Sequence, residues 1–178
     1  MGIVFNGIPP DLALRLKEEY SLEYFIETGT LVGNTAKWAS SHFEQVYTAE
    51  IAYKYFIRAK MNLLDLDNVQ LIYGYSADVL GGLLPTLNKP ALIWLDAHWS
   101  SDLGYNKSPD TMCPVMKELK QIEKHDNGHV ILIDDVRLFG VEDGWPSIDR
   151  VRNTLKSMGK IVTFETDVVI ATPKNGKS

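Results

Sequence analysis

The chain has 178 residues, of which 45% are hydrophobic and 23% charged, a balance typical of one globular domain with a full core. The formal net charge of −5 and the absence of a dense lysine and arginine cluster argue against a nucleic-acid partner and favour a small-molecule ligand. A single cysteine, Cys113, excludes an internal disulfide framework and a cysteine-built zinc site. No apolar run reaches the length of a membrane span, and the first residues lack the regions of a signal peptide. We therefore expect a cytoplasmic protein without a membrane partner.

The spacing of apolar residues predicts helices and strands in alternation along the chain. The first half is expected to contain a helix over 10–21, a strand over 24–28, a helix over 34–43 capped by Asn34 or Thr35, a strand over 45–50, a helix over 51–64, a strand over 69–74 and a helix over 76–87. The second half is expected to contain a strand over 90–98, a polar loop over 100–112, a helix over 113–125, a strand over 129–135, a helix over 146–159 and a hairpin over 160–173.

This alternation predicts right-handed crossovers and a mainly parallel sheet covered on both faces. The runs YFI, LIY, ALIWL and VILI are continuously apolar, as expected of strands buried on both faces. The closing hairpin would add an antiparallel strand at or near an edge, where two copies of the chain can pair as a homodimer. We expect an α/β fold with a doubly wound sheet in a single domain over 1–178, ending in a flexible tail over 172–178. In such sheets, ligands bind at the carboxyl ends of the strands.

The first predicted strand ends in the turn ETGTLVGNT, residues 27–35. Gly29 and Gly33 allow a tight turn and a close backbone approach to a ligand, and Thr28 and Thr30 add hydroxyl groups. The dinucleotide pattern G-x-G-x-x-G is not matched, because three residues separate the two glycines. The turn is either a ligand loop or a purely structural connection between strand and helix.

The next two strand ends carry Glu50 and Ser76. Glu50 follows the glycine turn at close to the spacing of about 20 residues at which an acid accepts hydrogen bonds from ribose hydroxyls. It can also be read as a solvated residue that opens the next helix. Together with the glycine turn, it favours an adenosine-type ligand. Ser76 either contacts that ligand or caps the following helix.

Three carboxylates follow the fourth and fifth strands, namely Asp96, Asp134 and Asp135. If these strands are neighbours, the three negative charges lie close together and repel one another. A hard divalent cation removes this repulsion, because carboxylate oxygens are its natural ligands. The alternative is that one aspartate caps a helix or pairs with Arg137 while another faces water. For the three acids together, the metal site is favoured.

His98 lies two residues after Asp96 and is the candidate general base, because an unperturbed imidazole titrates near neutral pH. The other histidines are expected to be structural: His42 at the end of a helix, and His125 and His129 at the surface before the fifth strand. Trp99 either packs over a substrate or covers the sheet.

The combination of ETGT-x-x-G, Glu50, LDAHW and ILIDD resembles the small class I S-adenosylmethionine-dependent methyltransferases. Within that superfamily, the sequence is similar to the metal-dependent O-methyltransferases of the catechol and macrocin type. The resemblance extends from the first strand to the closing hairpin, which is similar to the reversed last strand of the Rossmann-like superfamily fold. It implies S-adenosylmethionine as cofactor and a divalent cation such as Mg²⁺.

The resemblance also implies roles for individual residues. The methionine part of the cofactor would lie against the turn formed by Glu27, Thr28, Gly29, Thr30 and Gly33, and the ribose would bind Glu50. Ser76, taken from the third strand end, is a further candidate for cofactor binding. Magnesium would bind Asp96, Asp134 and Asp135, and His98 would take the proton of the substrate hydroxyl.

Two departures from the family pattern stand out. Related sequences commonly carry an acid near the adenine directly after the third-strand glycine, where this chain has Tyr75. The chain also lacks the long N-terminal extension that covers substrate in many members, which leaves substrate contact to the loop over 100–112.

The function expected from the sequence is O-methylation of a small hydroxylated acceptor, assisted by a divalent metal. The alternatives are a metal-dependent nucleotide-sugar transferase, since acids at strand ends also hold metal–nucleotide complexes, and a non-catalytic protein that binds S-adenosylmethionine. Vicinal diols of sugars and catechols fit a metal-bound oxygen equally well, so the sequence leaves the acceptor open.

Overall fold

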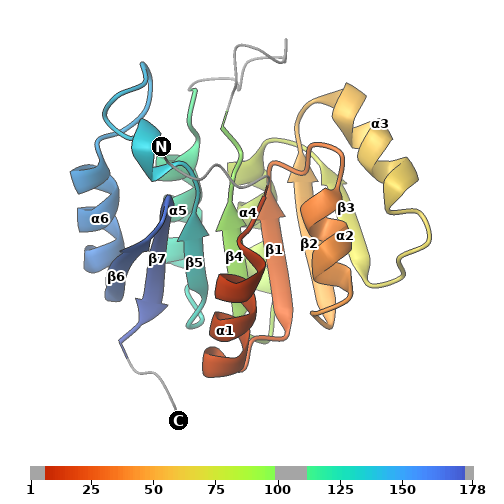
Figure 1. The fold of residues 1–178 in the computed structure, drawn as a ribbon, viewed down its shortest axis with the longest axis horizontal. Helices are drawn as coiled ribbons and strands as arrows, with labels where there is room; N and C mark the ends of the chain where they lie inside the picture. Colours follow the sequence, from red (N-terminus) through yellow and green to blue (C-terminus); the bar gives the residue numbers. More distant parts are fainter. Residues whose placement is uncertain (1–6, 99–111, 175–178) are drawn as a thin grey trace.

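The computed structural model describes residues 7–98 and 112–174. Within them, one seven-stranded sheet has the order β3-β2-β1-β4-β5-β7-β6 (Figure 1). Its strands are β1 (Tyr24–Thr28), β2 (Gln45–Glu50), β3 (Val69–Tyr73), β4 (Ala91–Leu95), β5 (Val130–Ile133), β6 (Lys160–Glu165) and β7 (Val168–Pro173). The strands pair in parallel from β3 through β5, and β7 is antiparallel to both of its neighbours. The expected doubly wound sheet with a reversed closing strand is confirmed.

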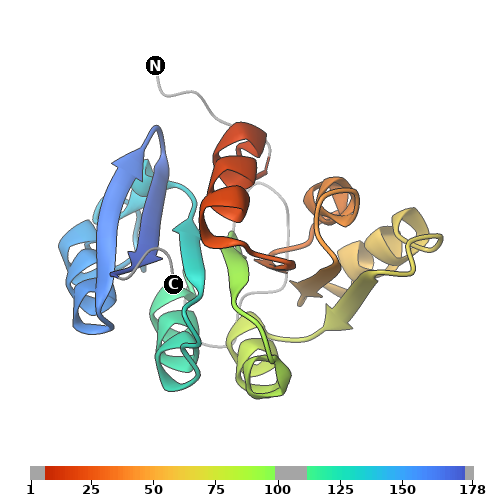
Figure 2. The same cartoon turned by 90° about the horizontal axis from the view of Figure 1, so that it is seen from below.

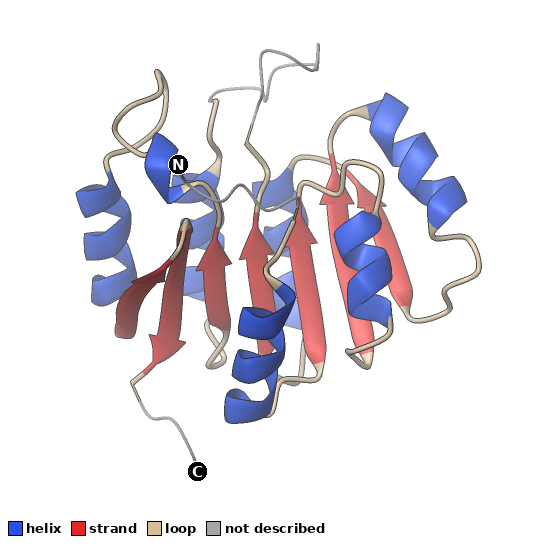
Figure 3. Ribbon diagram, in the orientation of Figure 1, coloured by secondary structure: helices blue, strands red, loops and turns tan. Residues whose placement is uncertain are grey.

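Helices cover both faces of this sheet (Figure 3). The helices are α1 (Pro10–Tyr20), α2 (Asn34–Ser40), α3 (Tyr53–Asn62), α4 (Ser76–Leu83), α5 (Val115–Lys124) and α6 (Ile148–Ser157), with short 3₁₀ turns η1 (Leu84–Thr86) and η3 (Val136–Leu138). No helix in the described ranges is long and apolar enough to cross a bilayer.

Each face of the sheet has its own core, and alternate residues of the central strands point into one or the other. Leu92 and Trp94 of β4 pack with residues of α1, α2 and α3, whereas Ile93 and Leu95 pack with residues of α4, α5 and α6. Figure 2 shows α1 and α2 on one side of the sheet and α4 and α5 on the other. The continuous apolar run of β4 is fully buried for this reason.

The order of connections places a switch point between β1 and β4. The chain moves outward from β1 through β2 to β3, and then returns to pair β4 on the other side of β1. The connections on either side of β1 leave the sheet in opposite directions, so a crevice opens at the carboxyl ends of these strands.

Several local expectations are wrong. The run LIY is not buried on both faces, because β3 is the edge strand and none of its residues is fully buried. Gly33, not Asn34 or Thr35, is the N-cap of α2. Thr172 and Pro173 belong to β7 and not to the tail, because they pair with Ile161 and Lys160. Residues 99–111, which include Trp99 and nearly all of the expected substrate loop, and 175–178 of the tail lie outside the described residues.

Candidate functional site

The candidate site lies where β1, β4 and β5 end at the same edge of the sheet. The backbone ladder continues past the strands, because Asp96 N donates to Thr28 O (3.1 Å) and Asp134 N donates to Leu95 O (3.2 Å). Both aspartates are thereby fixed beside a cavity of about 330 Å³, a size that suits a small-molecule ligand. The described residues that line it are Gly7, Glu27, Gly29, Thr30, Leu31, Val32, Asn34, Thr35, Asp96, His98, Asp134, Asp135 and Arg137.

The glycine turn after β1 passes directly against the β4 end. Gly29 has a φ of +87°, and a Cβ built there would lie 2.3 Å from Asp96 O. No other residue type fits this position, because both the conformation and the contact exclude a side chain. Gly29 N and Thr30 N both donate to Ala49 O (3.0 and 3.1 Å), which fixes the turn to the end of β2.

Glu27 is the most buried acid of the cavity lining, with an exposed fraction of 2%. Thr48 Oγ1 donates to Glu27 Oε2 (2.7 Å) and lies 2.6 Å from Thr30 Oγ1. Burial raises the pKa of Glu27 to about 8, against the lowering effect of the Thr48 and Thr35 hydroxyls. Glu27 is therefore largely protonated at neutral pH when no cation is near.

Glu50 is buried but is not among the described cavity residues. Its two carboxylate oxygens accept hydrogen bonds from Leu31 N (2.8 Å) and Ala52 N (2.7 Å). Leu31 has a φ of +52°, so this carboxylate supports an unfavourable backbone conformation in the glycine turn. Burial raises the pKa of Glu50, although these backbone N–H groups lower it. In this structure Glu50 holds the turn and the start of α3.

Three other predicted cofactor residues also lie outside the described lining of this cavity. Gly33 caps α2 and packs on Leu63, where a Cβ would approach to 3.0 Å. Thr28 and Ser76 are buried, and neither hydroxyl has a hydrogen-bond partner among the described residues. Ser76 is the first residue of α4, and Tyr75 is the N-cap, so Ser76 does not cap that helix.

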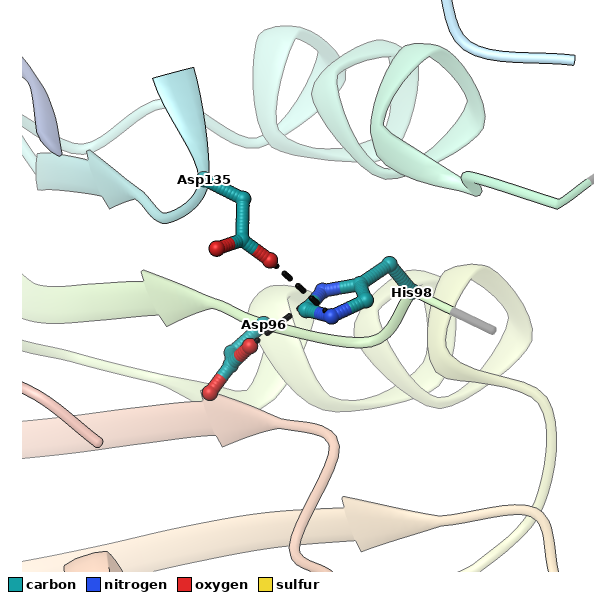
Figure 4. Close-up of side chains that lie close together, drawn as sticks. All are labelled: Asp96, His98 and Asp135. Carbon is teal, nitrogen blue, oxygen red and sulfur yellow. Dashed lines mark ion pairs between the residues drawn. The ribbon is translucent and has the colours of Figure 1, made fainter. Parts of the chain in front are cut away.

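His98 lies between two of the predicted metal ligands (Figure 4). Its Nε2 is 2.9 Å from Asp135 Oδ2, and its Nδ1 is 3.4 Å from Asp96 Oδ1. The side chains are partly or largely shielded, with exposed fractions of 24% for His98, 21% for Asp96 and 7% for Asp135. The sequence prediction that β4 and β5 bring these groups together is thus met by the geometry.

The acids at this edge differ in protonation. Burial raises the pKa of Asp96 well above its usual range, and burial together with the charge of Asp135 raises the pKa of Asp134 to about 6. Burial also opposes the ionised form of Asp135, but the hydrogen bond from His98 and the charge of Arg137 outweigh it and lower the pKa of Asp135. Burial disfavours the imidazolium of His98, yet the Asp135 hydrogen bond and the charges of Asp96 and Asp135 raise its pKa overall.

Arg137 forms the ion pair that the sequence left open as an alternative. Its Nη1 is 2.5 Å from Asp135 Oδ1 and also pairs with Asp167 in the turn between β6 and β7. Asp167 Oδ1 accepts a hydrogen bond from Arg137 N (2.9 Å), so this turn fixes the segment after β5. Part of the negative charge at the site is therefore balanced by His98 and Arg137.

The donor set also fits a divalent cation. Donor atoms of Asp96, His98 and Asp135 lie within 4.8 Å of one another, and so do those of Asp134, Asp135 and Asp167. Atoms that bind one such cation from opposite sides are about 4 Å apart, which is close to this separation. The first set contains His98 in place of the predicted Asp134. Carboxylate oxygens suit Mg²⁺ or Mn²⁺, whereas an imidazole ligand suits Zn²⁺ or Fe²⁺.

The sequence missed Glu118 and Trp145, which lie beside this site. The His98 and Trp145 rings are 5.3 Å apart, and Glu118 is 1% exposed on the buried face of α5. The prediction that His129 is a surface residue is wrong, because its side chain is 0% exposed and Nδ1 accepts a hydrogen bond from Ala91 N (3.0 Å). His42 follows α2 as expected, with Nδ1 2.8 Å from Trp38 O.

Comparison with known proteins places this geometry in a structural class. No protein-family model matches the sequence, and no curated protein matches it either. Among solved structures, a protein from Streptococcus mutans assigned as a methyltransferase and bound to SAH (S-adenosylhomocysteine) is similar with a TM-score of 0.64, at 16% identity over 94% of this chain and 99% of that one.

Two further structures are described as O-methyltransferases. One, from Staphylococcus aureus and assigned as a caffeoyl-CoA O-methyltransferase, has a TM-score of 0.64 at 16% identity, covering 97% of this chain and 86% of that one. The other, from Bacillus cereus in complex with SAH, has a TM-score of 0.61 at 18% identity, covering 96% and 84%. At these identities the likeness is one of fold. The chain has the Rossmann-like fold of S-adenosylmethionine-dependent methyltransferases.

Proposed function

We propose that this protein is an S-adenosylmethionine-dependent methyltransferase that methylates an oxygen of a small hydroxylated acceptor with the help of a divalent cation. The observation that carries the proposal is the convergence of Glu27, Asp96 and His98 on one cavity at the switch point of a methyltransferase fold. The cavity of about 330 Å³ and the side-chain-free surface at Gly29 suit a ligand that lies against the β1 turn.

The residues of the cavity suit the charges of the cofactor. When bound, S-adenosylmethionine supplies an electrophilic methyl group on a sulfonium, and its amino group is a second positive charge. Glu27 is a buried acid without a cationic partner among the described residues, and it would bind the amino group as a carboxylate. Gly29 and Thr30 would lie against the methionine part of the cofactor, as the sequence predicts.

The metal would be held by Asp96, Asp134 and Asp135, and Asp135 belongs to both clusters of candidate donor atoms. When bound, the cation supplies a positive charge that lowers the pKa of an acceptor hydroxyl. Because the structural neighbours establish fold alone, this metal requirement is part of the proposal. Arg137 already balances Asp135, so the acids at this edge do not depend on the cation alone.

His98 would act as general base through Nδ1. Its Nε2 is hydrogen-bonded to Asp135, which orients the ring and leaves Nδ1 to accept the acceptor's hydroxyl proton. When bound, S-adenosylmethionine would supply the methyl group to that oxygen and would leave as SAH. The residues of the cavity would hold the acceptor and the cofactor next to each other, which favours the reaction.

The test is a methyl-transfer assay with the full chain, S-adenosylmethionine and a panel of catechols and sugar diols, read by mass spectrometry. We expect a product 14 mass units heavier than one acceptor (about one methylene, the net change of O-methylation), and loss of turnover when a chelator removes divalent ions. Unchanged turnover after chelation would contradict the metal, and SAH binding without turnover across the panel would contradict the reaction.

One departure from the family pattern supports a second candidate, a non-catalytic protein that binds the cofactor, because Tyr75 stands where related sequences commonly carry an acid. Both oxygens of Glu50, the predicted ribose ligand, also accept backbone hydrogen bonds, so its contact with a cofactor would differ from the predicted one. Such a protein would bind SAH and give no product with any acceptor in the assay above. The nucleotide-sugar transferase has no counterpart among the three structures compared.

A further inference from the structure

A second, smaller cavity adjoins the candidate site on the α5 side of the strand ends. Asp96 and His98 line both cavities, and Glu118, Phe139 and Trp145 line only the smaller one. Its volume is about 10 Å³, which is about the space that one water molecule needs. It therefore accepts a single polar group and excludes a ring or a chain.

The carboxyl group of Glu118 is the unusual feature of this cavity. Glu118 is 1% exposed, and its Oε1 has no hydrogen-bond partner among the described residues. Burial raises the pKa of Glu118 to about 7, while the nearby hydroxyls of Ser76 and Thr28 lower it. Those two hydroxyls are themselves buried and lack partners within hydrogen-bond distance in the described part of the chain. Glu118 Oε1 is thus a buried acceptor that no group in the described residues satisfies, beside two hydroxyls that interact with the carboxyl only weakly.

This arrangement costs stability. A buried polar group without a hydrogen bond is unfavourable, and a buried carboxylate is more so. The neighbours of Glu118 on the buried face of α5 are Val115, Leu119 and Ile122, so an apolar side chain would pack there without this cost. A carboxyl group at this position is better explained by a ligand than by folding.

The charge of the cavity indicates what kind of group would bind. Its described lining contains the acids Asp96, Asp134 and Glu118, a single imidazole from His98, and no lysine or arginine. Such a lining disfavours carboxylates and phosphates. It favours a group that donates hydrogen bonds, and the nearby Trp145 ring is compatible with a cation as well as with a hydroxyl.

We infer that Glu118 forms a subsite that binds one hydrogen-bond-donating group of the acceptor, a hydroxyl or an ammonium, beside the hydroxyl presented to His98. The identity of the ligand as a methyl acceptor rests on the proposed function, whereas the subsite itself rests on the geometry of Glu118. Glu118 would select acceptors that carry a second donor group and reject those with an anion in its place.

The direct test uses the smallest donors as probes. Methylammonium and methanol are titrated separately into the full chain, with acetate as the anionic control, and the indole N–H resonance of Trp145 is followed by NMR after assignment with a Trp145→Phe variant. We expect a saturable shift with at least one donor and none with acetate. The stronger of the two donors then identifies ammonium or hydroxyl as the preferred group.

Two variants of α5 make the test specific. Glu118→Met replaces the carboxyl with an apolar side chain of similar size, and Glu123→Gln changes an exposed acid on the same helix. The shift should disappear in Glu118→Met and persist in Glu123→Gln. An equal shift in Glu118→Met, or no shift with either donor in the unmodified chain, would overturn the inference.

Thermal unfolding separates a ligand-binding role from a structural one. Because Glu118→Met removes an unsatisfied buried carboxyl, we expect its melting temperature to rise by about 2–4 °C. A fall of that size would assign Glu118 to the core and overturn the subsite. Calorimetry with SAH on the same samples tests the proposed function independently, since a chain that gives the Trp145 shift but does not bind SAH would retain the subsite and lose the methyltransferase.

Discussion

His98 and His129 lie at opposite ends of the sheet and are used in opposite ways. His98 follows β4 at the carboxyl edge, beside two carboxylates and a cavity, and its pKa is raised. His129 precedes β5 at the other end and is fully buried, and burial is the main cause of its lowered pKa. The same side chain is therefore held ready to gain a proton at one end and kept neutral at the other.

The partners of the two histidines explain this difference. At the end of the sheet where His129 lies, Lys160 Nζ is hydrogen-bonded to Asp126 Oδ1 (2.9 Å) and to His129 O (2.7 Å). One acid is therefore paired with one cation there. At the carboxyl edge, Asp96, Asp134 and Asp135 share His98 and Arg137, so acids outnumber cations. A balanced, hydrogen-bonded cluster stabilises the fold, whereas an unbalanced one costs stability and provides binding sites.

The largest effect is expected from removing the imidazole of His98. His98→Ala should lower methyl transfer by about 10²- to 10⁴-fold, because the general base is lost, while SAH affinity changes by less than about threefold. The measurement is single-turnover product formation together with SAH calorimetry. Full activity in His98→Ala would contradict the assignment of the base.

A substitution in the cluster of Lys160, Asp126 and His129 should change the stability of the protein and not its activity. Lys160→Ala removes the hydrogen bond to the buried His129 carbonyl and the ion pair to Asp126, so we expect a loss of about 1–3 kcal/mol in the free energy of unfolding. Lys156→Ala, at an exposed position of α6, is the matched control and should change stability by less than about 0.5 kcal/mol. Urea unfolding at pH 7 measures both. A neutral Lys160→Ala would remove the contrast between the two ends.

Proton linkage at Glu27 is the next largest effect. In the free protein its pKa is about 8, so it carries a proton at pH 7. A bound ammonium favours the carboxylate, so SAH binding should release a proton and tighten by up to about tenfold per pH unit as the pH rises towards 8. Calorimetry in buffers of different ionisation enthalpy detects the proton. Glu27→Gln should weaken SAH binding and remove its pH dependence. Uptake of a proton on SAH binding, instead of release, would contradict this linkage.

The smallest effect concerns His129 and acid stability. Its folded pKa is lowered, so below about pH 6.5 the unfolded chain binds a proton that the folded chain does not. Stability therefore falls as the pH drops through that range. His129→Asn keeps an acceptor for Ala91 N but does not titrate, and should reduce the loss between pH 7.5 and 5.5 by at most about 1.4 kcal/mol. Parallel pH profiles of the two proteins would contradict the linkage.

The sequence predicted the parts of the site that depend on one strand end at a time. Gly29 and Glu27 were identifiable because a glycine turn follows a buried strand, and Asp96 and Asp135 because parallel strands end at the same edge. The burial of Glu118 was also within reach, since Val115, Leu119 and Ile122 place position 118 on the apolar face of a helix.

Features that depend on contacts between distant segments could not be predicted. His129 is buried because it accepts a hydrogen bond from Ala91, 38 residues away, and no local pattern marks that contact. The pairing of Arg137 with Asp167 requires the β6–β7 turn to lie against η3. Similarly, β3 resembles a central strand in sequence, and only the strand order makes it an edge.

Calorimetry with SAH, with and without Mg²⁺, measures whether the carboxyl edge of the sheet binds the cofactor. If the carboxyl edge is a methyltransferase site, SAH binds the full chain at pH 8, Glu27→Gln weakens that binding by at least about tenfold, and Lys160→Ala leaves it unchanged under conditions where it is folded. If SAH does not bind either with or without Mg²⁺, the carboxyl edge is not a methyltransferase site.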